Sequence, residues 1–190
     1  MIEKIKEDLF KAYIGKVDRL NHVYGVKNTA VKLAKIHGVD LKQTMIAAYL
    51  HDITKYEPLN FHHDMISSVY SEVILETYTE PLYHAYSAAA IAETKYGIKD
   101  QEIIQAIKSH AVGRPNMSLL EKIIFISDYI EPYRTYPSCV EVREIAFKDL
   151  DLAVYMAIKH SIHLYEKLGG FVPKVAYEAL KFYREGGSYE

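Results

Sequence analysis

Several residue types that mark special classes of protein are scarce in this chain of 190 residues. There is no tryptophan and only one cysteine, Cys139, so no disulfide can form within the chain. A lone cysteine fits a reducing compartment, and we expect a cytoplasmic protein. The first seventeen residues mix acidic and basic side chains without a continuous apolar stretch, which is not typical of a signal peptide.

Excess positive charge and long apolar runs are also lacking. The formal net charge is −2 and the isoelectric point is near 6.5, which gives no support for nucleic-acid binding through bulk positive charge. The longest apolar runs, such as residues 123–126, are far shorter than the roughly 20 residues that a membrane-spanning helix needs. We therefore expect neither a nucleic acid nor a membrane as a partner.

Apolar residues recur at intervals of three and four along almost the whole chain, whereas the alternation typical of strands is nearly absent. All six prolines fall at the boundaries of these patterns, and no repeat or linker interrupts them. The sequence predicts one all-α domain over residues 1–190. Its helices are expected from Ile2, from His22 to near Gly38, over 41–50, over 60–78 in one or two pieces, from Pro81 to before Gly97, over 100–110, from Ser118 to Asp128, and over 140–150, 151–168 and 173–184.

Two helix starts carry capping signals. Asp40 precedes one apolar pattern and is a suitable N-cap. Ser118 and Glu121 have the spacing of a capping box before another.

Six side chains of the kinds that bind metals fall on apolar faces or at the ends of these helices. A single histidine on an apolar face is more often a core residue with one hydrogen bond. Four histidines and two aspartates together are hard to satisfy without a shared cation, because a buried charge needs a partner. Imidazole and carboxylate groups hold transition metals while leaving a coordination position open, which favours a metal-dependent hydrolase. The six are His22, His51, Asp52, His84, His110 and Asp128.

The adjacent pair His51 and Asp52 sets a geometric condition. Neighbours on a helix point about 100° apart, so both reach one ion only if the helix ends there. Residues 53–58, which close with Pro58, offer such an end. A carboxylate such as Asp52 can bridge two ions, and six ligands suit two ions better than one. The ligand types are compatible with Fe, Mn, Co, Ni or Zn.

The remaining histidines are weaker candidates. His62 and His63, followed by Asp64, have no apolar stripe that ties them to the six, so we expect a solvated or capping role. His160 and His163 are one helical turn apart and face either a neighbouring helix or solvent.

Three segments carry a family resemblance. RLNH at 19–22, HDITK at 51–55 and HAVGRPNMSLLEKIIFISDYIEPYR at 110–134 resemble the YqeK family of the HD-domain phosphohydrolase superfamily, and the likeness covers roughly residues 18–185. The resemblance implies an HD-type helical bundle with a binuclear metal centre, usually of iron. It also implies symmetrical hydrolysis of diadenosine tetraphosphate to two molecules of ADP.

The same resemblance implies how the ligands are shared between two ions. One ion would be held by His22, His51, Asp52 and Asp128, and Asp52 would bridge to a second ion at His84 and His110. The chain departs from the family at two places: Val112 stands where the family often has threonine, and Ala85-Tyr86 replaces a frequent Gly-Pro. Neither departure removes a ligand.

Basic residues near the six ligands suggest how phosphate would be bound. Lys55, one turn past the His-Asp pair, either reaches a metal-bound phosphate or caps the helix end at the surface. Arg114 follows the flexible Gly113, and we expect it to bind phosphate through two hydrogen bonds, with a loop-anchoring ion pair as the alternative. Arg134 is a further phosphate candidate, with a salt bridge to Glu131 as the alternative. Catalysis would then rest on Asp52 together with Lys55 and Arg114.

The leading hypothesis is therefore a metal-dependent bis(5'-nucleosyl)-tetraphosphatase with a small nucleotide substrate. Two alternatives stay open: a phosphohydrolase for nucleoside di- or triphosphates or a cyclic nucleotide, and a non-catalytic nucleotide sensor that retains a metal. Seventeen tyrosines allow apolar contacts at the surface and permit a homodimer.

Overall fold

The computed structural model describes residues 1–187, and this part of the chain is helical and contains no strand. The helices form where apolar residues recur every three or four positions, since that spacing places them on one face. In chain order the elements are α1 (Ile2–Ala12), α2 (Val17–His37), α3 (Leu41–Leu50), α4 (Leu59–Val69), α5 (Val73–Thr77), the 3-10 turn η1 (Glu80–Leu82), α6 (Tyr83–Thr94), α7 (Gln101–Ser109), α8 (Leu119–Ile130), α9 (Pro137–Ala146), α10 (Leu150–Lys167) and α11 (Lys174–Gly187).

The expected helix termini of the central segments are confirmed. The side chain of Asp40 accepts a hydrogen bond from the backbone N–H of Gln43 at 2.7 Å, which caps α3. Ser118 and Glu121 form the expected capping box at the start of α8. Gly38 ends α2 in the left-handed region with φ 69°, a conformation that glycine adopts without strain.

Other boundaries differ from the sequence prediction. α9 starts at Pro137 itself, before the expected residue 140, because the first helical position does not need a backbone N–H. It ends at Ala146, and Asp149 caps α10 by accepting from the N–H of Leu152 at 2.9 Å. Pro81 lies in the short 3-10 turn that precedes α6, so the α-helix itself begins two residues later. Residues 60–78 divide into α4 and α5.

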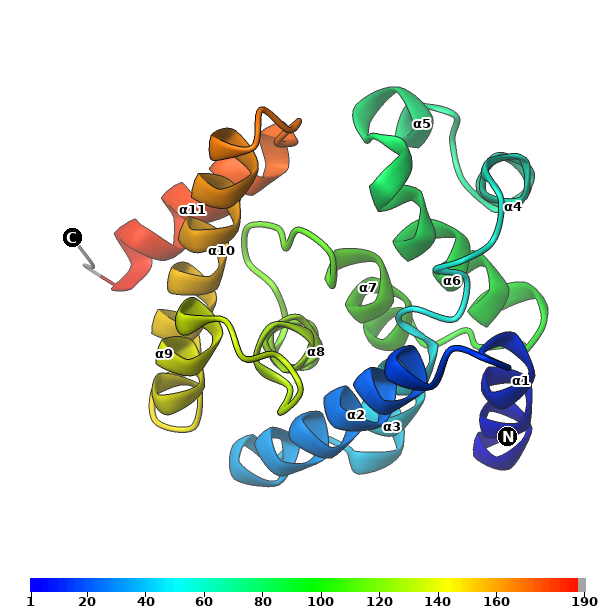
Figure 1. Cartoon of the computed structure of the whole chain (residues 1–190), viewed down its shortest axis with the longest axis horizontal. Helices are drawn as coiled ribbons and strands as arrows, with labels where there is room; N and C mark the ends of the chain where they lie inside the picture. The colour runs from blue at the N-terminus through cyan, green and yellow to red at the C-terminus, as the bar shows by residue number, and fades with distance from the viewer. Residues whose placement is uncertain (188–190) are drawn as a thin grey trace.

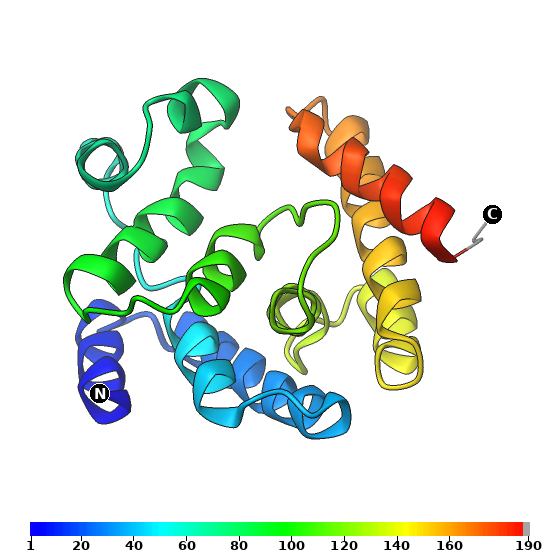
Figure 2. The ribbon, with the colours of Figure 1, turned by 180° about the vertical axis from the view of Figure 1, so that it is seen from behind.

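α8 is the central helix of the bundle. It packs against α2 and α7 on one side and against α9 and α10 on the other, and in Figure 1 it lies end-on between these groups. Figure 2 shows the same order from behind, with α4–α6 and α10–α11 at opposite sides. Buried apolar residues from Ile5 in α1 to Tyr183 in α11 form one continuous core cluster. The single-domain boundary 1–190 stays a prediction, and residues 188–190 lie outside the described part.

None of the described helices is both long enough and apolar enough to cross a bilayer.

Candidate metal centre

The six side chains singled out by the sequence lie together at the meeting point of five helices. α2 contributes His22 and α6 contributes His84, and Asp128 comes from the last turn of α8. The other three follow the ends of α3 and α7, where the chain leaves the helix. Five of the six are buried and the carboxylate of Asp128 is half-buried.

Asp52 occupies the middle of this group. Its Oδ2 lies 3.7 Å from Nε2 of His22 and 3.5 Å from Nε2 of His51. Its Oδ1 lies 3.2 Å from Nε2 of His84 and 3.6 Å from Nε2 of His110. The donor atoms therefore form two groups of three, His22–His51–Asp52 and Asp52–His84–His110, that share Asp52.

The sixth residue joins the first of these groups. Oδ1 of Asp128 lies 3.0 Å from Nε2 of His22 and 3.9 Å from Nε2 of His51. The arrangement thus has one carboxylate between two clusters and a second carboxylate at one end.

The end of α3 makes this arrangement possible. The helix stops at Leu50 and residues 51–56 form turns, so His51 and Asp52 are released from the 100° separation of helical neighbours. The Tyr13 hydroxyl donates to the backbone carbonyl of Asp52 at 2.5 Å and fixes the turn.

Each histidine has its Nδ1 tied to an acceptor outside the cluster. Because carbonyl and carboxylate oxygens only accept, Nδ1 carries the proton of each neutral imidazole, and Nε2 then presents a lone pair to the cluster. The acceptors are the carbonyls of Ala48 for His51 (2.7 Å), Ile107 for His110 (2.7 Å) and Pro81 for His84 (2.9 Å), and Oε1 of Glu131 for His22 (3.2 Å).

The described residues do not satisfy all of the inward-facing nitrogens. Nε2 of His22 and Nε2 of His51 are buried and have no hydrogen-bond partner among the described residues. The Nε2 atoms of His84 and His110 lie 3.2 Å apart, and two lone pairs at that distance repel. A cation accounts for both observations, and the nitrogen and carboxylate donors fit a transition metal. Their role as ligands stays a prediction.

Neighbouring side chains keep the carboxylates of Asp52 and Asp128 ionised. Burial alone would raise the pKa of Asp52, but His51 and the other histidines hold that pKa well below its usual range. NH1 of Arg19 also contacts Oδ2 of Asp52 at 2.7 Å. Burial would likewise raise the pKa of Asp128, and Arg134, whose NH2 lies 3.0 Å from Oδ1, keeps that pKa well below normal. Both aspartates are therefore charged at neutral pH and available to a cation.

The histidines differ in their protonation. Burial lowers the pKa of His84 to about 4 and also lowers the pKa of His51, so both are neutral at pH 7. Burial would lower the pKa of His22 too, but the neighbouring carboxylates of Asp128 and Glu131 outweigh it and raise this pKa to about 9. Metal binding at His22 would have to displace that proton.

Glu131 supports His22 and was not predicted as part of the site. It is buried with 1% exposure, and its Oε2 accepts from the backbone N–H of Tyr133 at 2.7 Å. α2 leaves room for it only because residue 25 is glycine: a Cβ there would lie 2.6 Å from Oε2 of Glu131. Its place three residues after Asp128, at the end of the same helix, is the signal in the sequence that could have identified it.

Arg143 was also missed. Its guanidinium donates to the backbone carbonyls of Ile130 (2.7 Å), Glu131 (2.8 Å) and Arg134 (2.7 Å). This side chain of α9 therefore fixes the segment that carries Glu131 and Arg134.

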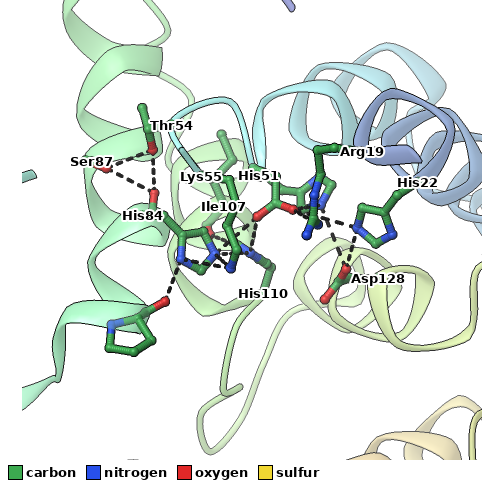
Figure 3. A network of polar contacts seen from close by, with 12 residues as sticks. Arg19, His22, His51, Thr54, Lys55, His84, Ser87, Ile107, His110 and Asp128 are labelled. Atoms are coloured by element: carbon green, nitrogen blue, oxygen red, sulfur yellow. Dashed lines mark hydrogen bonds and ion pairs between the residues drawn. The ribbon is translucent and has the colours of Figure 1, made fainter. Parts of the chain in front are cut away.

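The prediction that His62 is solvated is wrong. His62 is 5% exposed, and its Nδ1 lies 2.8 Å from the Ser87 hydroxyl. That hydroxyl lies 2.8 Å from the Thr54 hydroxyl, which donates to the carbonyl of His84 at 2.9 Å (Figure 3). Packing of α4 against α6 buries His62. The hydroxyls of Ser87 and Thr54 connect it to the backbone of His84, a predicted ligand. His63 is exposed, as expected.

The basic residues take different places. Nζ of Lys55 lies 3.1 Å from Nε2 of His84, so Lys55 points into the cluster and does not cap the helix at the surface.

Arg114 makes the alternative contact, an ion pair: its Nε and NH2 bind the two oxygens of buried Glu121 at 2.7 and 2.5 Å. Gly113 next to it is buried with φ 71°, a turn position that favours glycine. Arg134 forms a salt bridge, which was the alternative to phosphate binding, but the expected partner is wrong: it is Asp128 and not Glu131.

The two C-terminal histidines lie apart from the cluster. His160 is 3.7 Å from Glu141 of α9, and His163 is exposed. Neither contributes to the two donor groups.

Comparison with known proteins places this geometry in a family. Residues 19–133 match the HD domain family, and this segment contains all six residues of the cluster. The chain belongs to the HD domain family. The family match and the two donor groups of histidine and aspartate together support binding of a divalent metal.

Relatives at higher identity narrow the comparison. The HD-domain chain is 40% identical over 144 residues to a symmetrical bis(5'-nucleosyl)-tetraphosphatase of Halalkalibacterium halodurans, covering 76% of this chain and 77% of that protein. It is 39% identical, with the same coverage, to the protein of that name from Bacillus subtilis. A crystal structure from Clostridium acetobutylicum, described as a "predicted HD superfamily hydrolase involved in NAD metabolism", superposes with a TM-score of 0.87 at 32% identity and covers 98% of both chains. The all-α fold and the YqeK-like family assignment are thereby confirmed.

Proposed function

We propose that this protein hydrolyses diadenosine tetraphosphate symmetrically into two molecules of ADP. The observation that carries the proposal is the pair of donor groups that share Asp52, together with the buried Nε2 atoms of His22 and His51, which have no hydrogen-bond partner among the described residues. The tetraphosphatase relatives, 38–40% identical over three quarters of the chain, supply the substrate class.

The cofactor of this reaction would be two transition-metal ions. His22, His51, Asp52 and Asp128 would hold one, and Asp52, His84 and His110 the other. We propose iron as the first metal to test, with Mn, Co, Ni and Zn as alternatives, because this ligand set serves all of them. When bound, such ions neutralise phosphate charge and lower the pKa of a water molecule.

The chain's own residues would position the tetraphosphate. Lys55 lies beside His84 with its ammonium group toward the cluster, where it can bind a phosphate oxygen. Arg134 sits at the opposite end beside Asp128 and is half-buried, so it can offer one N–H to the substrate while it holds the carboxylate. Water adds to one of the two central phosphorus atoms, the bridging P–O bond breaks, and its oxygen leaves with the second ADP. Cations on both sides of the cluster favour gripping the middle of the phosphate chain.

Arg114 is not part of this scheme. Its guanidinium is occupied by Glu121, which the Ser109 hydroxyl also contacts at 3.0 Å, so the contact ties the α7–α8 loop to α8. It holds the segment that follows His110. The substrate contacts assigned to Arg114 and Gly113 stay predictions, as do the cytoplasmic location and the homodimer.

Product analysis tests the proposal. Metal-free protein is reloaded with iron, manganese or zinc, incubated with diadenosine tetraphosphate, and the nucleotides are separated by chromatography. We expect ADP as the sole nucleotide product, formed only with metal. ATP with AMP would show that the bridge between an outer and a central phosphate is cleaved, and absence of turnover with every metal would favour another nucleotide substrate or a nucleotide sensor.

A further inference from the structure

An apolar cavity of about 160 Å³ lies between three connections of the bundle. Side chains from the α5–α6 connection, the α7–α8 loop and the α10–α11 region enclose it, including Leu82, Val112, Ile158 and Phe171. Figures 1 and 2 both show α5–α6 and α10–α11 on either side of the α7–α8 loop. We call this space the apolar cavity.

Two residues that line the apolar cavity adjoin residues of the metal cluster. Pro81 lines it, and the carbonyl of this residue accepts from Nδ1 of His84 at 2.9 Å. Ala111 also lines it and directly follows His110. A molecule in the cavity is therefore adjacent to the Asp52–His84–His110 group.

The volume of the cavity limits the size of the ligand that it can hold. A dry cavity of about 150 Å³ accommodates a benzene ring, whereas sites for whole drug-sized ligands are several times larger. The apolar cavity thus has room for a planar ring system and not for a complete nucleotide. Among the described residues that line it there is no lysine, arginine, histidine or carboxylate, so these side chains would not compensate the charge of a phosphate.

Its chemistry fits a nucleobase. Tyr165 and Phe171 are 44% and 52% exposed, and their rings line the cavity, where a base can stack on them. The hydroxyls of Thr79 and Ser161 line the cavity too, and neither has a hydrogen-bond partner among the described residues. A hydroxyl both donates and accepts, so these two can satisfy the polar edge of a base.

We propose that the apolar cavity binds the base of one nucleoside of the substrate while its phosphates lie at the metal cluster. The proposal rests on the proposed function for the identity of the nucleotide. Binding of a base on the His84 side would place the adjoining phosphates beside Lys55, the cation on that side of the cluster. The product ADP uses the same contacts, so it is a ligand that can be measured without turnover.

The test compares ADP with inorganic pyrophosphate, which has the phosphates of ADP and no nucleoside. Isothermal titration calorimetry is done on metal-loaded protein with Ser161→Phe, which fills the cavity from α10. We expect ADP binding to weaken at least about tenfold and pyrophosphate binding to change less than about twofold. The matched control is Leu164→Phe on the same helix, because Leu164 is 54% exposed and does not line the cavity; both affinities should be unchanged.

A second variant avoids a disturbed core. Phe171→Ala shortens an exposed side chain at the cavity wall and is expected to weaken ADP binding several-fold with pyrophosphate binding retained. Unchanged ADP affinity in both variants, or equal losses for ADP and pyrophosphate, would overturn the assignment of the cavity to a base.

The two proposals fail separately. Wild-type protein that binds ADP in a cavity-dependent way but does not cleave the tetraphosphate refutes only the proposed activity. Cleavage to two ADP with KM and ADP affinity unchanged in Ser161→Phe refutes only the apolar cavity as the base site.

Discussion

The two sides of the shared carboxylate are surrounded by different chemistry. On the side we call the His22 end, His22 lies among the carboxylates of Asp128 and Glu131, with Arg134 on Asp128. Arg19 contacts the same Oδ2 of Asp52 that faces this end. Charged partners thus hold each other in place, and buried charge-assisted contacts of this kind define geometry well.

On the other side, the His84 end, neutral groups hold the candidate ligands in place. Backbone carbonyls of Pro81 and Ile107 fix the imidazoles of His84 and His110. Lys55 is the cation that contacts this end, and the apolar cavity begins next to it.

The two ends therefore differ in how much positive charge they can offer to a bound phosphate. At the His22 end, the ion pairs keep the donor group rigid. Arg19 and Arg134 are already engaged there by Asp52 and Asp128 and are only partly available to a phosphate. A neutral surrounding with one lysine leaves positive charge available to phosphate. We therefore expect the substrate to be held chiefly from the His84 end.

Removing the shared carboxylate should have the largest effect, because it belongs to both ends. Asp52→Asn keeps the shape of the side chain and removes the charge that both donor groups use. We expect metal content to fall and tetraphosphate hydrolysis to drop by about 10³-fold or more. Elemental analysis and steady-state kinetics measure both.

Asp18→Asn is the control for this variant, since Asp18 is exposed and adjoins Arg19 in the sequence. Full metal content with normal turnover in Asp52→Asn would refute the bridging role.

A glycine substitution should affect the His22 end alone. Gly25→Ala places a Cβ 2.6 Å from Oε2 of Glu131 and displaces the group that orients His22. Loss of such outer support typically weakens metal binding about 10–100-fold. Alanine in place of a helical glycine adds about 1 kcal/mol of helix preference, so metal affinity should fall without a matching loss of helicity.

Metal titration and circular dichroism of Gly25→Ala separate these two effects. Gly186→Ala in α11 is the matched control, because a Cβ there has no atom of the described residues within 4 Å. Equal metal affinity in the two variants would mean that Glu131 does not support the His22 end.

The smallest effect concerns pH in the metal-free protein, where the two ends should respond with opposite sign. His22, with a pKa raised to about 9, contributes stability that is fully present below its unfolded pKa of about 6.5 and is lost as pH rises through 9. His84, with a pKa lowered to about 4, binds fewer protons when folded, so stability is lost as pH falls from 6.5 toward 4.

Thermal unfolding in the presence of a chelator measures this difference. We expect His22→Gln to flatten the alkaline side of the Tm–pH profile and His84→Gln to flatten the acidic side, each by a few degrees. Identical profiles for the two variants would remove the electrostatic distinction between the ends.

Much of the fold was predictable because it depends on near neighbours in the chain. The N-cap at Asp40, the capping box at Ser118 and the end of α2 at Gly38 use groups within a few residues, and all three are confirmed. α9 was misplaced because a proline marks a loop as readily as the first turn of a helix.

The site was predictable as a set of residues and less so as a set of contacts. Spacing placed three histidines and one aspartate on inward faces, since helical periodicity fixes which face a residue shares, and the end of an apolar run added the pair His51 and Asp52. The surroundings of His62, Arg114 and Arg134 required the packed helices, because the partner of each comes from another element or from a loop conformation.

The sequence by itself thus determined most of the helices, the family and the candidate metal ligands, for these follow from periodicity, caps and motif residues. Only the tertiary structure decided that Asp52 stands between two donor groups, that Glu131 fits beside Gly25, and that a cavity opens next to His84. The physical reason is that distances between side chains on different helices depend on how those helices pack. No interval along the chain encodes them directly.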